Sequence, residues 1–519
     1  MANQVEEGTL PRISKWLPAA LSTTLIIGSA WNALVPLRKG PWFIFAEDDC
    51  FYYLRVATNI AAGLGSTFNG IVPTNGYHPL WLAILAGVSC VSANPNFMAA
   101  FLAAISFTST VLTYFLARKL LRQAIEAPVL ASALAIIVTF YSIPLLNTGM
   151  EVILTIPLLL GVVIVFQDDR IWTRTTFSFG FGLLLALAVL SRLDVMIFAS
   201  LLALQVCLSR SLRAKLRLRP LVFMTLGFSP VLAYLIFNRF EFHTWLPVSG
   251  MAKQLKAAYS ISLVPWTIFF KNKSYVLILV AFCLPLSFVP KVRALFTPAQ
   301  RVLFSSVLLF PWIYIFTLSL LSDWRLWSWY FYSLRIALCV SFCILLSVIP
   351  SQRWSRTPIV TVLAVFASIG VIATYKRKPI QQVPEIYAAA QEIKSFADSH
   401  PGIYAMGDRA GIPGYLMQSP LVQTEGLVMD KDFLMQIKHQ VPLGQALAKY
   451  NVRYYVASSE QPLHGCFHAE EPAQAGKDSP HMRAEICEQP LATFEVNGLS
   501  DNQAEHWTYI FKVPFDSAP

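Results

Sequence analysis

The stretch from Trp16 to Leu37, WLPAALSTTLIIGSAWNALVPL, decides the class of fold to which this chain belongs. It is apolar over the roughly 20 residues that a helix needs to cross the hydrocarbon core of a bilayer. It is too long for the apolar core of a signal peptide, and no small-residue cleavage site follows it. We therefore predict a retained first transmembrane helix, with the polar segment that contains Arg12 and Lys15 on the cytoplasmic side.

The composition of the whole chain agrees with a membrane protein. Of its 519 residues, 55% are hydrophobic and 13% are charged, which is about half the charged fraction of an ordinary soluble domain. The formal net charge of +11 comes from Lys and Arg residues that cluster between apolar stretches, a pattern that fixes membrane topology. We therefore expect membrane lipids around the chain and no nucleic-acid partner.

Further apolar segments recur as far as residue 375. Together with the first they lie at 17–37, 97–117, 128–147, 150–166, 175–190, 194–208, 219–237, 274–290, 302–321, 333–350 and 357–375. The basic runs begin at Arg118, Arg210, Lys291 and Arg353. If all four runs face the cytoplasm, only one full crossing fits between the first outer loop and Arg118, so 79–93 should be a partial or re-entrant helix. We predict a polytopic α-helical protein with about eleven crossings, with twelve or thirteen as alternatives.

The composition changes after Lys376. Residues 380–519 are polar and contain no apolar run of spanning length. A helical spacing covers Glu385–Ala397, and strand-like patterns cover Ile403–Met406, Val452–Ala457 and Trp507–Val513. We therefore divide the chain into a transmembrane domain at 1–378, whose first outer loop is 38–80, and a soluble extracytoplasmic α/β domain at 379–519.

Two of the eight cysteines, Cys466 and Cys487, lie in this polar region. If this region faces an oxidising compartment, we predict a disulfide between these two cysteines. The spacing of the cysteines and histidines does not suggest a zinc site.

Three consecutive carboxylates, Glu47-Asp48-Asp49, begin where the first helix should leave the membrane. Such neighbours repel one another, so at least one should have a raised pKa unless a cation compensates. A carboxylate in this setting can take the proton from an acceptor hydroxyl, or help to bind a divalent metal. The alternative is a solvated acidic turn at the start of a helix.

The residues around this triplet carry a family resemblance. The pattern consists of Asp48-Asp49, Tyr52-Tyr53, Arg55, Ala57, Asn59, Gly63, Gly65, Asn69-Gly70 and Asn75-Gly76-Tyr77-His78-Pro79-Leu80-Trp81. It resembles the bacterial GT-C fold membrane glycosyltransferases, in particular the arabinofuranosyltransferase and mannosyltransferase-like branch. The similarity continues at Thr148–Glu151, Ser191–Asp194, Pro247–Lys253 and Gly407–Gly411.

The resemblance implies a polyprenyl-phosphate sugar as donor and an acidic residue of the first outer loop as catalytic base. We therefore predict Asp48 or Asp49 as the base, with Glu47 in support. Three other charged residues, Glu151, Arg192 and Asp194, either form a structural ion pair or orient the acceptor and the acids. The sequence does not decide between these two roles.

Cations and aromatic residues in the later loops complete the predicted site. Arg239 and Lys253 are the candidates for the donor phosphate, because a cation stabilises the charge that develops on the leaving group; Arg325 or Arg335 could assist. Tyr52, His78, Trp329 and Tyr330 are candidates for substrate binding, although aromatic residues at helix ends often serve as interface anchors. Gly407–Gly414 lacks the order of a nucleotide-binding loop, so we do not interpret it as one.

The sequence thus predicts a glycosyltransferase of the bacterial cytoplasmic membrane, with its active site and its carboxyl-terminal domain on the periplasmic side. The acceptor could be an envelope glycan, a lipid or a protein, and a divalent metal at the acids stays an open alternative. A flippase for lipid-linked sugars should show internal repeats and broken paired helices, and none are evident. A non-catalytic envelope assembly protein is the other alternative, with the acids as a solvated turn.

Overall fold

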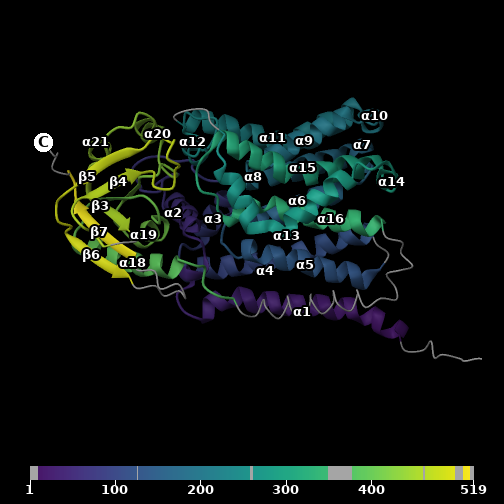
Figure 1. The fold of residues 1–519 in the computed structure, drawn as a ribbon, viewed down its shortest axis with the longest axis horizontal. Coiled ribbons are helices and arrows are strands. Elements are labelled where there is room, and N and C mark those ends of the chain that lie inside the picture. The colour runs from purple at the N-terminus through teal and green to yellow at the C-terminus, as the bar shows by residue number, and fades with distance from the viewer. Residues whose placement is uncertain are drawn as a thin grey trace, which may run out of the picture.

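A computed structural model describes residues 10–124, 127–256, 261–348, 377–459, 462–496 and 506–514. A bundle of helices forms one part of the molecule, and a smaller unit that contains the strands caps one end of it (Figure 1). The predicted apolar segment 357–375 lies outside the described residues.

Long apolar helices build the bundle. They are α1 (Leu10–Arg38), α4 (Pro95–Ala124), α5 (Pro128–Leu146), α11 (Leu218–Glu241), α13 (Val264–Leu286), α15 (Pro298–Leu321) and α16 (Ser333–Val348). Within the described part of the chain, six helices are long and apolar enough to cross a membrane, and α13 makes a seventh if its two bent halves form one span. The predicted polytopic α-helical membrane protein is confirmed.

Three shorter apolar helices fill the space between the long ones: α6 (Val152–Val165), α8 (Thr175–Ser191) and α9 (Val195–Leu208). A helix of 14 residues such as α6 is only about 21 Å long, so it does not span a bilayer core of about 30 Å on its own. Most of the side chains of α6 are buried among its neighbours. The predicted bounds of these three helices agree with the structure to within two residues. By contrast, the predicted segment begins at 274, because Lys271 interrupts the apolar run, whereas the helix α13 starts at Val264.

Helix α3 (Pro79–Val91) has 13 residues and is too short to cross the membrane. It starts with Pro79 at its first position, where the missing N–H costs nothing, and it lies at the end of the bundle that faces the strands (Figure 1). This arrangement agrees with the predicted partial helix.

The basic runs that fall within the described residues lie at the opposite end of the bundle, whereas the predicted run that begins at Arg353 lies outside the described residues. The short helices α10 (Arg210–Arg213) and α14 (Pro290–Arg293) carry two of them, and α7 (Arg170–Thr173) lies beside these (Figure 1). The length of the apolar bundle therefore separates the loops that carry α7, α10 and α14 from the strand-containing unit. This separation is the one that the charge pattern predicted.

The strand-containing unit is an α/β structure. Its main sheet has the order β2-β1-β3-β7-β6, with β1, β2 and β3 parallel and β7 antiparallel to β3 and β6, and β4 and β5 form a separate hairpin. Its elements are α18 (Val383–Ser399), β1 (Ile403–Met406), α19 (Gly411–Leu416), β2 (Leu421–Gln423), α20 (Lys431–Lys438), α21 (Leu443–Ala448), β3 (Val452–Ser459), β4 (Phe467–Glu471), β5 (Met482–Ile486), β6 (Ala492–Val496) and β7 (His506–Lys512). The structure joins Cys466 to Cys487 in a disulfide that closes the open end of the β4–β5 hairpin.

The first outer loop links the two parts. After α1 the chain forms a short 3-10 helix, η1 (Trp42–Phe45), and then α2 (Asp48–Ala61), which packs against both α3 and α19. Two other short helices lie in later loops of the chain: α12 (Val248–Ala252) follows α11, and η2 (Ser328–Phe331) follows α15. The acidic triplet therefore sits at the junction of the bundle and the α/β unit.

Candidate active site

The three predicted acids lie at the amino end of α2. Glu47 is the residue that caps the helix, and Asp48 and Asp49 form its first turn. Negative side chains are favoured there because they complement the helix dipole. Their surroundings differ, however, and the differences separate their roles.

Asp48 ties the first outer loop to the α/β unit. Its two carboxylate oxygens accept hydrogen bonds from the backbone amides of Gly411 (2.9 Å) and Ile412 (2.8 Å). Burial raises the pKa of Asp48 to about 7, although these two amides act in the opposite direction. A side chain at Gly411 would collide with the carbonyl oxygen of Asp48, since an added Cβ would come within 2.2 Å of it. The glycine-rich segment 407–414 thus holds a carboxylate of this chain.

Asp49 is only partly buried, and the described residues make no hydrogen bond to its carboxylate. Burial raises its pKa to about 6, the Lys253 ammonium opposes that shift, and Glu151 and Asp408 add to it. Its oxygens are therefore available to accept a proton, and with a pKa of about 6 the carboxyl group is mostly ionised at neutral pH. Asp49 has the properties of a general base.

Lys253 is the predicted cation that the fold brings to Asp49. Its ammonium donates a hydrogen bond to the hydroxyl of Tyr330 (2.8 Å) and lies 6.0 Å from the ring of Trp324. Burial alone would lower the pKa of Lys253, but Tyr330 and Asp49 outweigh burial and raise it. The loop that carries Lys253 is fixed by Asn75, whose side-chain oxygen accepts from the amide of Val248 (3.0 Å). The motif loop at 73–81 therefore positions this cation.

Glu151, Arg192 and Asp194 form one buried ion-pair network. Arg192 donates to Glu151 (2.6 Å) and, through two nitrogens, to Asp194 (2.8 Å and 3.2 Å). Asp194 also accepts from the hydroxyls of Tyr314 (2.7 Å) and Tyr332 (2.8 Å). One guanidinium thus bridges two carboxylates, and tyrosine hydroxyls also donate to both carboxylates.

His78 and Tyr53 attach the first outer loop to this network. The hydroxyl of Tyr53 donates to Glu151 (3.0 Å), and the ring of His78 lies 3.8 Å from the same carboxylate. The Nδ1 atom of His78 accepts from the amide of Leu193 (3.3 Å). Both ring nitrogens of His78 thus face protein groups, so its position is that of a structural link. Sequence reasoning did not single out Tyr53.

The remaining predicted residues divide into two groups. Tyr52 and Trp329 are buried, at 6% exposure each, and the phenol of Tyr52 interacts electrostatically with Asp48, Asp49 and Glu425. Arg239, by contrast, ends α11 with an exposed side chain. No ion pair or hydrogen bond connects it to the other site residues within the described ranges. Of the two predicted phosphate-binding cations, only Lys253 reaches the acids.

Three acids of the α/β unit, Asp408, Glu425 and Glu471, extend the acidic cluster. Asp408 raises the pKa of Asp48, Asp49 and Glu471, and Glu425 has its own pKa raised by burial and then by Asp408 and Glu471. The sequence hinted only at Asp408, through the Gly407–Gly411 segment. Glu425 and Glu471 carry no local signal, because the folding of the α/β unit alone brings them here.

A largely apolar cavity of about 820 Å³ opens on the bundle side of the acids. Its walls come from α5, α13 and α16, and Glu47, Arg335, Arg377 and Lys378 line its polar end. Arg335 is 2% exposed, and its Nε atom is buried without a hydrogen-bond partner. Arg377 is held by the carbonyls of Phe45 and Asn147, each at 2.8 Å. The cavity combines a hydrocarbon-like wall with a cationic end.

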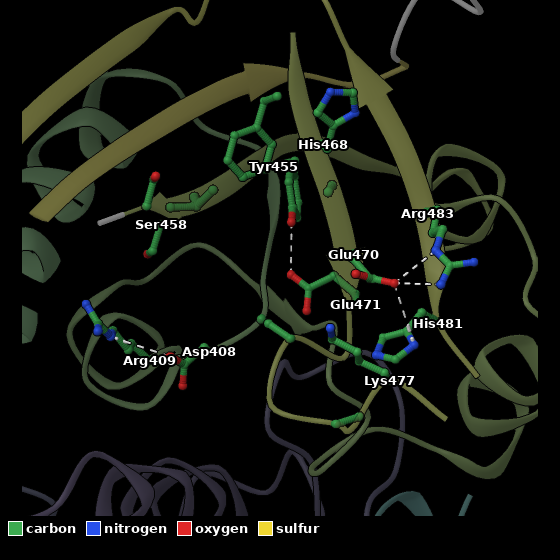
Figure 2. Close-up of a pocket in the computed structure, with 17 residues that line it drawn as sticks. Asp408, Arg409, Tyr455, Ser458, His468, Glu470, Glu471, Lys477, His481 and Arg483 are labelled. Carbon is green, nitrogen blue, oxygen red and sulfur yellow. Dashed lines mark hydrogen bonds and ion pairs between the residues drawn. The ribbon is translucent and has the colours of Figure 1, made fainter. Parts of the chain in front are cut away.

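A second, polar cavity of about 700 Å³ lies in the α/β unit (Figure 2). The loop after β1, which carries Asp408, forms one side of it, and the β4–β5 hairpin forms another. Because the same loop continues into Gly411 and Ile412, this cavity adjoins Asp48. The acidic triplet thus stands between an apolar, cation-ended cavity and a polar one.

The three carboxylates of the triplet are not gathered within 4.8 Å of one another in this structure. In the part of the chain that the structure describes, the only group of three potential ligand atoms within 4.8 Å of one another is Cys466, Glu485 and Cys487. Those two cysteines are joined in the disulfide. The carboxylates at 47–49 do not converge as the ligands of a divalent cation would.

Comparison with known proteins shows the architecture to be shared. No family model and no curated protein sequence matches the chain. The solved structure of ArnT from Cupriavidus metallidurans bound to undecaprenyl phosphate matches with a TM-score of 0.51 and 11% identity, over 92% of this chain and 98% of that one. Its apo state matches with a TM-score of 0.52 and 14% identity, over 86% and 93%. The fold is GT-C.

A third match is the Archaeoglobus fulgidus oligosaccharyltransferase tethered with an acceptor peptide, with a TM-score of 0.50 and 10% identity over 92% of this chain and 75% of that one. Since these superpositions cover most of the chain, the GT-C fold accounts for the bundle and for most of the α/β unit. The predicted GT-C fold is confirmed, and the arabinofuranosyltransferase-like branch stays a prediction.

Proposed function

We propose that this chain is a membrane glycosyltransferase that moves a sugar from a polyprenyl phosphate to an acceptor hydroxyl on the outer side of the cytoplasmic membrane. The observation that carries the proposal is the carboxylate of Asp49, which accepts no hydrogen bond from the described residues and interacts electrostatically with Lys253. Its neighbour Glu47 lines the apolar cavity, and its neighbour Asp48 binds the loop that lines the polar cavity. ArnT, which shares the GT-C fold, was solved with undecaprenyl phosphate bound, which supports a lipid-linked donor.

Asp49 acts as the base in this scheme. It takes the proton of the acceptor hydroxyl, whose oxygen forms a bond to the anomeric carbon of the donor sugar. The bond between that carbon and the phosphate oxygen breaks, and the electron pair leaves with the polyprenyl phosphate, which gains one negative charge. Asp48 serves as a positioning residue, because both of its oxygens are engaged by the α/β unit.

The apolar cavity is the proposed donor site. Its hydrocarbon-like walls suit a polyprenyl chain, and its cationic end suits the phosphate, whose growing charge a cation stabilises. Arg335 is the best-placed residue, since its buried Nε atom lacks a partner. Lys253 faces Asp49 instead and keeps that carboxylate ionised.

The test uses a strain in which the gene is deleted and which is complemented with the wild-type protein, the Asp49→Asn variant or a control variant. The measurement is the chase of radiolabelled sugar from the organic-extractable lipid pool into the envelope fraction. Loss of the base should slow this transfer by about 10²- to 10⁴-fold, and labelled lipid should accumulate. Asp432→Asn is the matched control, because Asp432 is an exposed residue of α20.

Equal protein levels and equal thermal unfolding of the two variants would show that folding is preserved. Normal transfer by the Asp49→Asn variant would refute the assignment of the base. Normal transfer in the deletion strain itself would refute the proposed function.

A further inference from the structure

The polar cavity of the α/β unit has the location of a ligand site. The loop that follows β1 and the last residues of β3 line it, so it lies beyond the carboxyl ends of two parallel strands. Ligands of α/β sheets bind at this edge because the loops there leave a crevice between neighbouring strands. The β4–β5 hairpin closes the other side (Figure 2).

The charges around the cavity are largely paired with one another. Asp408 lies 3.5 Å from Arg409, and Glu470 accepts two hydrogen bonds from Arg483, at 2.9 Å and 2.6 Å. Figure 2 shows these two pairs on opposite sides of the cavity. Because the pairs cancel, the cavity presents little surplus charge of either sign. Such a surface suits an uncharged polar ligand better than an anion or a cation.

Two buried polar groups, Glu471 and His481, form part of the wall of the cavity. His481 is 4% exposed and Glu471 is 5% exposed. Oε1 of Glu471 accepts from Tyr455 (2.9 Å), Thr424 and the amide of Ala473 interact with the same carboxylate, and the Nδ1 of His481 lies 3.8 Å from Glu470. The wall of the cavity therefore contains both donors and acceptors, which suits a ligand that both donates and accepts. Hydroxyl groups do both.

The cavity is also connected to the acids of the first outer loop. Its wall residue Asp408 interacts electrostatically with both Asp48 and Asp49. Three residues further on, the same loop donates its amides to Asp48. A second connection runs through the bundle loop at 322–332, since Asp323 accepts from Ser479 (2.6 Å), next to the cavity segment 473–477. The cavity therefore lies next to the junction at Asp48, which is the neighbour of Asp49 in the first turn of α2.

We propose that this cavity binds the acceptor and that the part of the acceptor held there is an uncharged carbohydrate. The inference rests on the proposed function, because it assigns the acceptor of that same reaction. The partly exposed ring of Phe467 offers an apolar face for the C–H side of a sugar, and the polar groups around it meet the hydroxyls of the sugar.

The experiment uses the full-length protein in lipid nanodiscs. Ser458 lines the cavity with an exposed side chain, so Ser458→Trp fills the cavity without disturbing the buried core. Ser395→Trp, on the exposed face of α18, is the matched control. The probes are mannotetraose, galactotetraose and arabinotetraose, with tetragalacturonate and a Ser/Thr-rich peptide for comparison. Binding is measured by saturation-transfer NMR and by isothermal titration.

We expect at least one neutral tetrasaccharide to bind the wild-type protein. Ser458→Trp should weaken that binding at least tenfold, and Ser395→Trp should leave it unchanged. His481→Ala should weaken it as well. The inference is overturned if no neutral tetrasaccharide binds, if only the charged sugar or the peptide binds, or if Ser458→Trp has no effect.

Binding to the Asp49→Asn variant separates this inference from the proposed function. Glycan binding that persists in that variant, with no transfer by the wild-type protein, would support the cavity and refute the transferase. Transfer by the wild-type protein that Ser458→Trp leaves unchanged would support the transferase and refute the cavity as the acceptor site.

Discussion

Two adjacent aspartates of the same helical turn have different partners, and this difference gives them different chemistry. Asp48 accepts two backbone amides, and hydrogen bonds of this kind stabilise the ionised form. Among the described residues, none donates such a bond to Asp49, and the cation that acts on it is Lys253. The two amides fix the orientation of Asp48 and favour its ionised form, whereas the lone pairs of Asp49 stay available for a proton, so the bonding pattern favours Asp49.

The pH dependence of transfer should follow Asp49. Burial raises its pKa to about 6, and a base must be ionised to act, so transfer should fall as the pH drops below about 6 and level off above about 7. Lys253→Met removes the cation that lowers this pKa, so the midpoint should move to higher pH. The measurement is the initial rate of transfer in nanodiscs at saturating donor. A rate that stays constant between about pH 5 and pH 8 would contradict this assignment.

Arg335 should determine the affinity for the donor. Its loss removes a charge-assisted contact of about 1.5–3 kcal/mol, so Arg335→Gln should raise the donor concentration at half-maximal rate by roughly ten- to a hundredfold. Arg335→Lys should recover part of this loss. Arg293→Gln, at the far end of the bundle, is the control. If Arg335→Gln lowers only the thermal stability and leaves the donor dependence intact, the residue is structural.

At the scale of elements, α2 and α19 carry the coupling between the bundle and the α/β unit. Their closest approach occurs at Gly411, where only hydrogen fits. Helix α19 has six residues, so its own hydrogen bonds contribute little, and its position depends on Asp48 and on packing against Phe68. The site is therefore assembled by the docking of two elements that are more than 360 residues apart in the chain.

Gly411→Ala should disrupt this docking. The added methyl group overlaps the backbone of Asp48, and overpacking of this kind costs about 1–3 kcal/mol. We expect faster proteolysis of the α/β unit and a marked loss of transfer. Gly87→Ala in α3 is the control, since an added Cβ there meets nothing within 4 Å. Equal protease resistance of the two variants would show that the contact at Gly411 is dispensable.

Across the whole molecule, the sequence predicted what depends on local pattern. Apolar length located α4, α5 and α15, and alternation located β1 and β3, because each of these elements buries a face of its own. The acids of the first outer loop were found in the same way, through their motif. Long-range packing was not predictable. Arg239 and Lys253 were predicted in one loop, but the structure places Arg239 in the last turn of α11 with an exposed side chain and Lys253 at the end of α12, where it is close enough to interact with Asp49. Glu471 reaches the site because the β4–β5 hairpin packs beside β3, where Tyr455 donates to it.

The orientation of the whole molecule in the membrane is the last property that the charge pattern predicts, and it follows from the separation of the basic helices from the α/β unit. In a background with Cys90→Ser and Cys207→Ser, which removes the exposed free cysteines, Ser395→Cys on α18 should react with a membrane-impermeant maleimide in intact spheroplasts. Arg293→Cys on α14 should react only after permeabilisation. The Cys466–Cys487 disulfide requires an oxidising compartment, so it agrees with this orientation. The reverse labelling pattern would place the acids in the cytoplasm, where nucleotide-linked sugars are the available donors, and would remove the reason for a lipid-linked one.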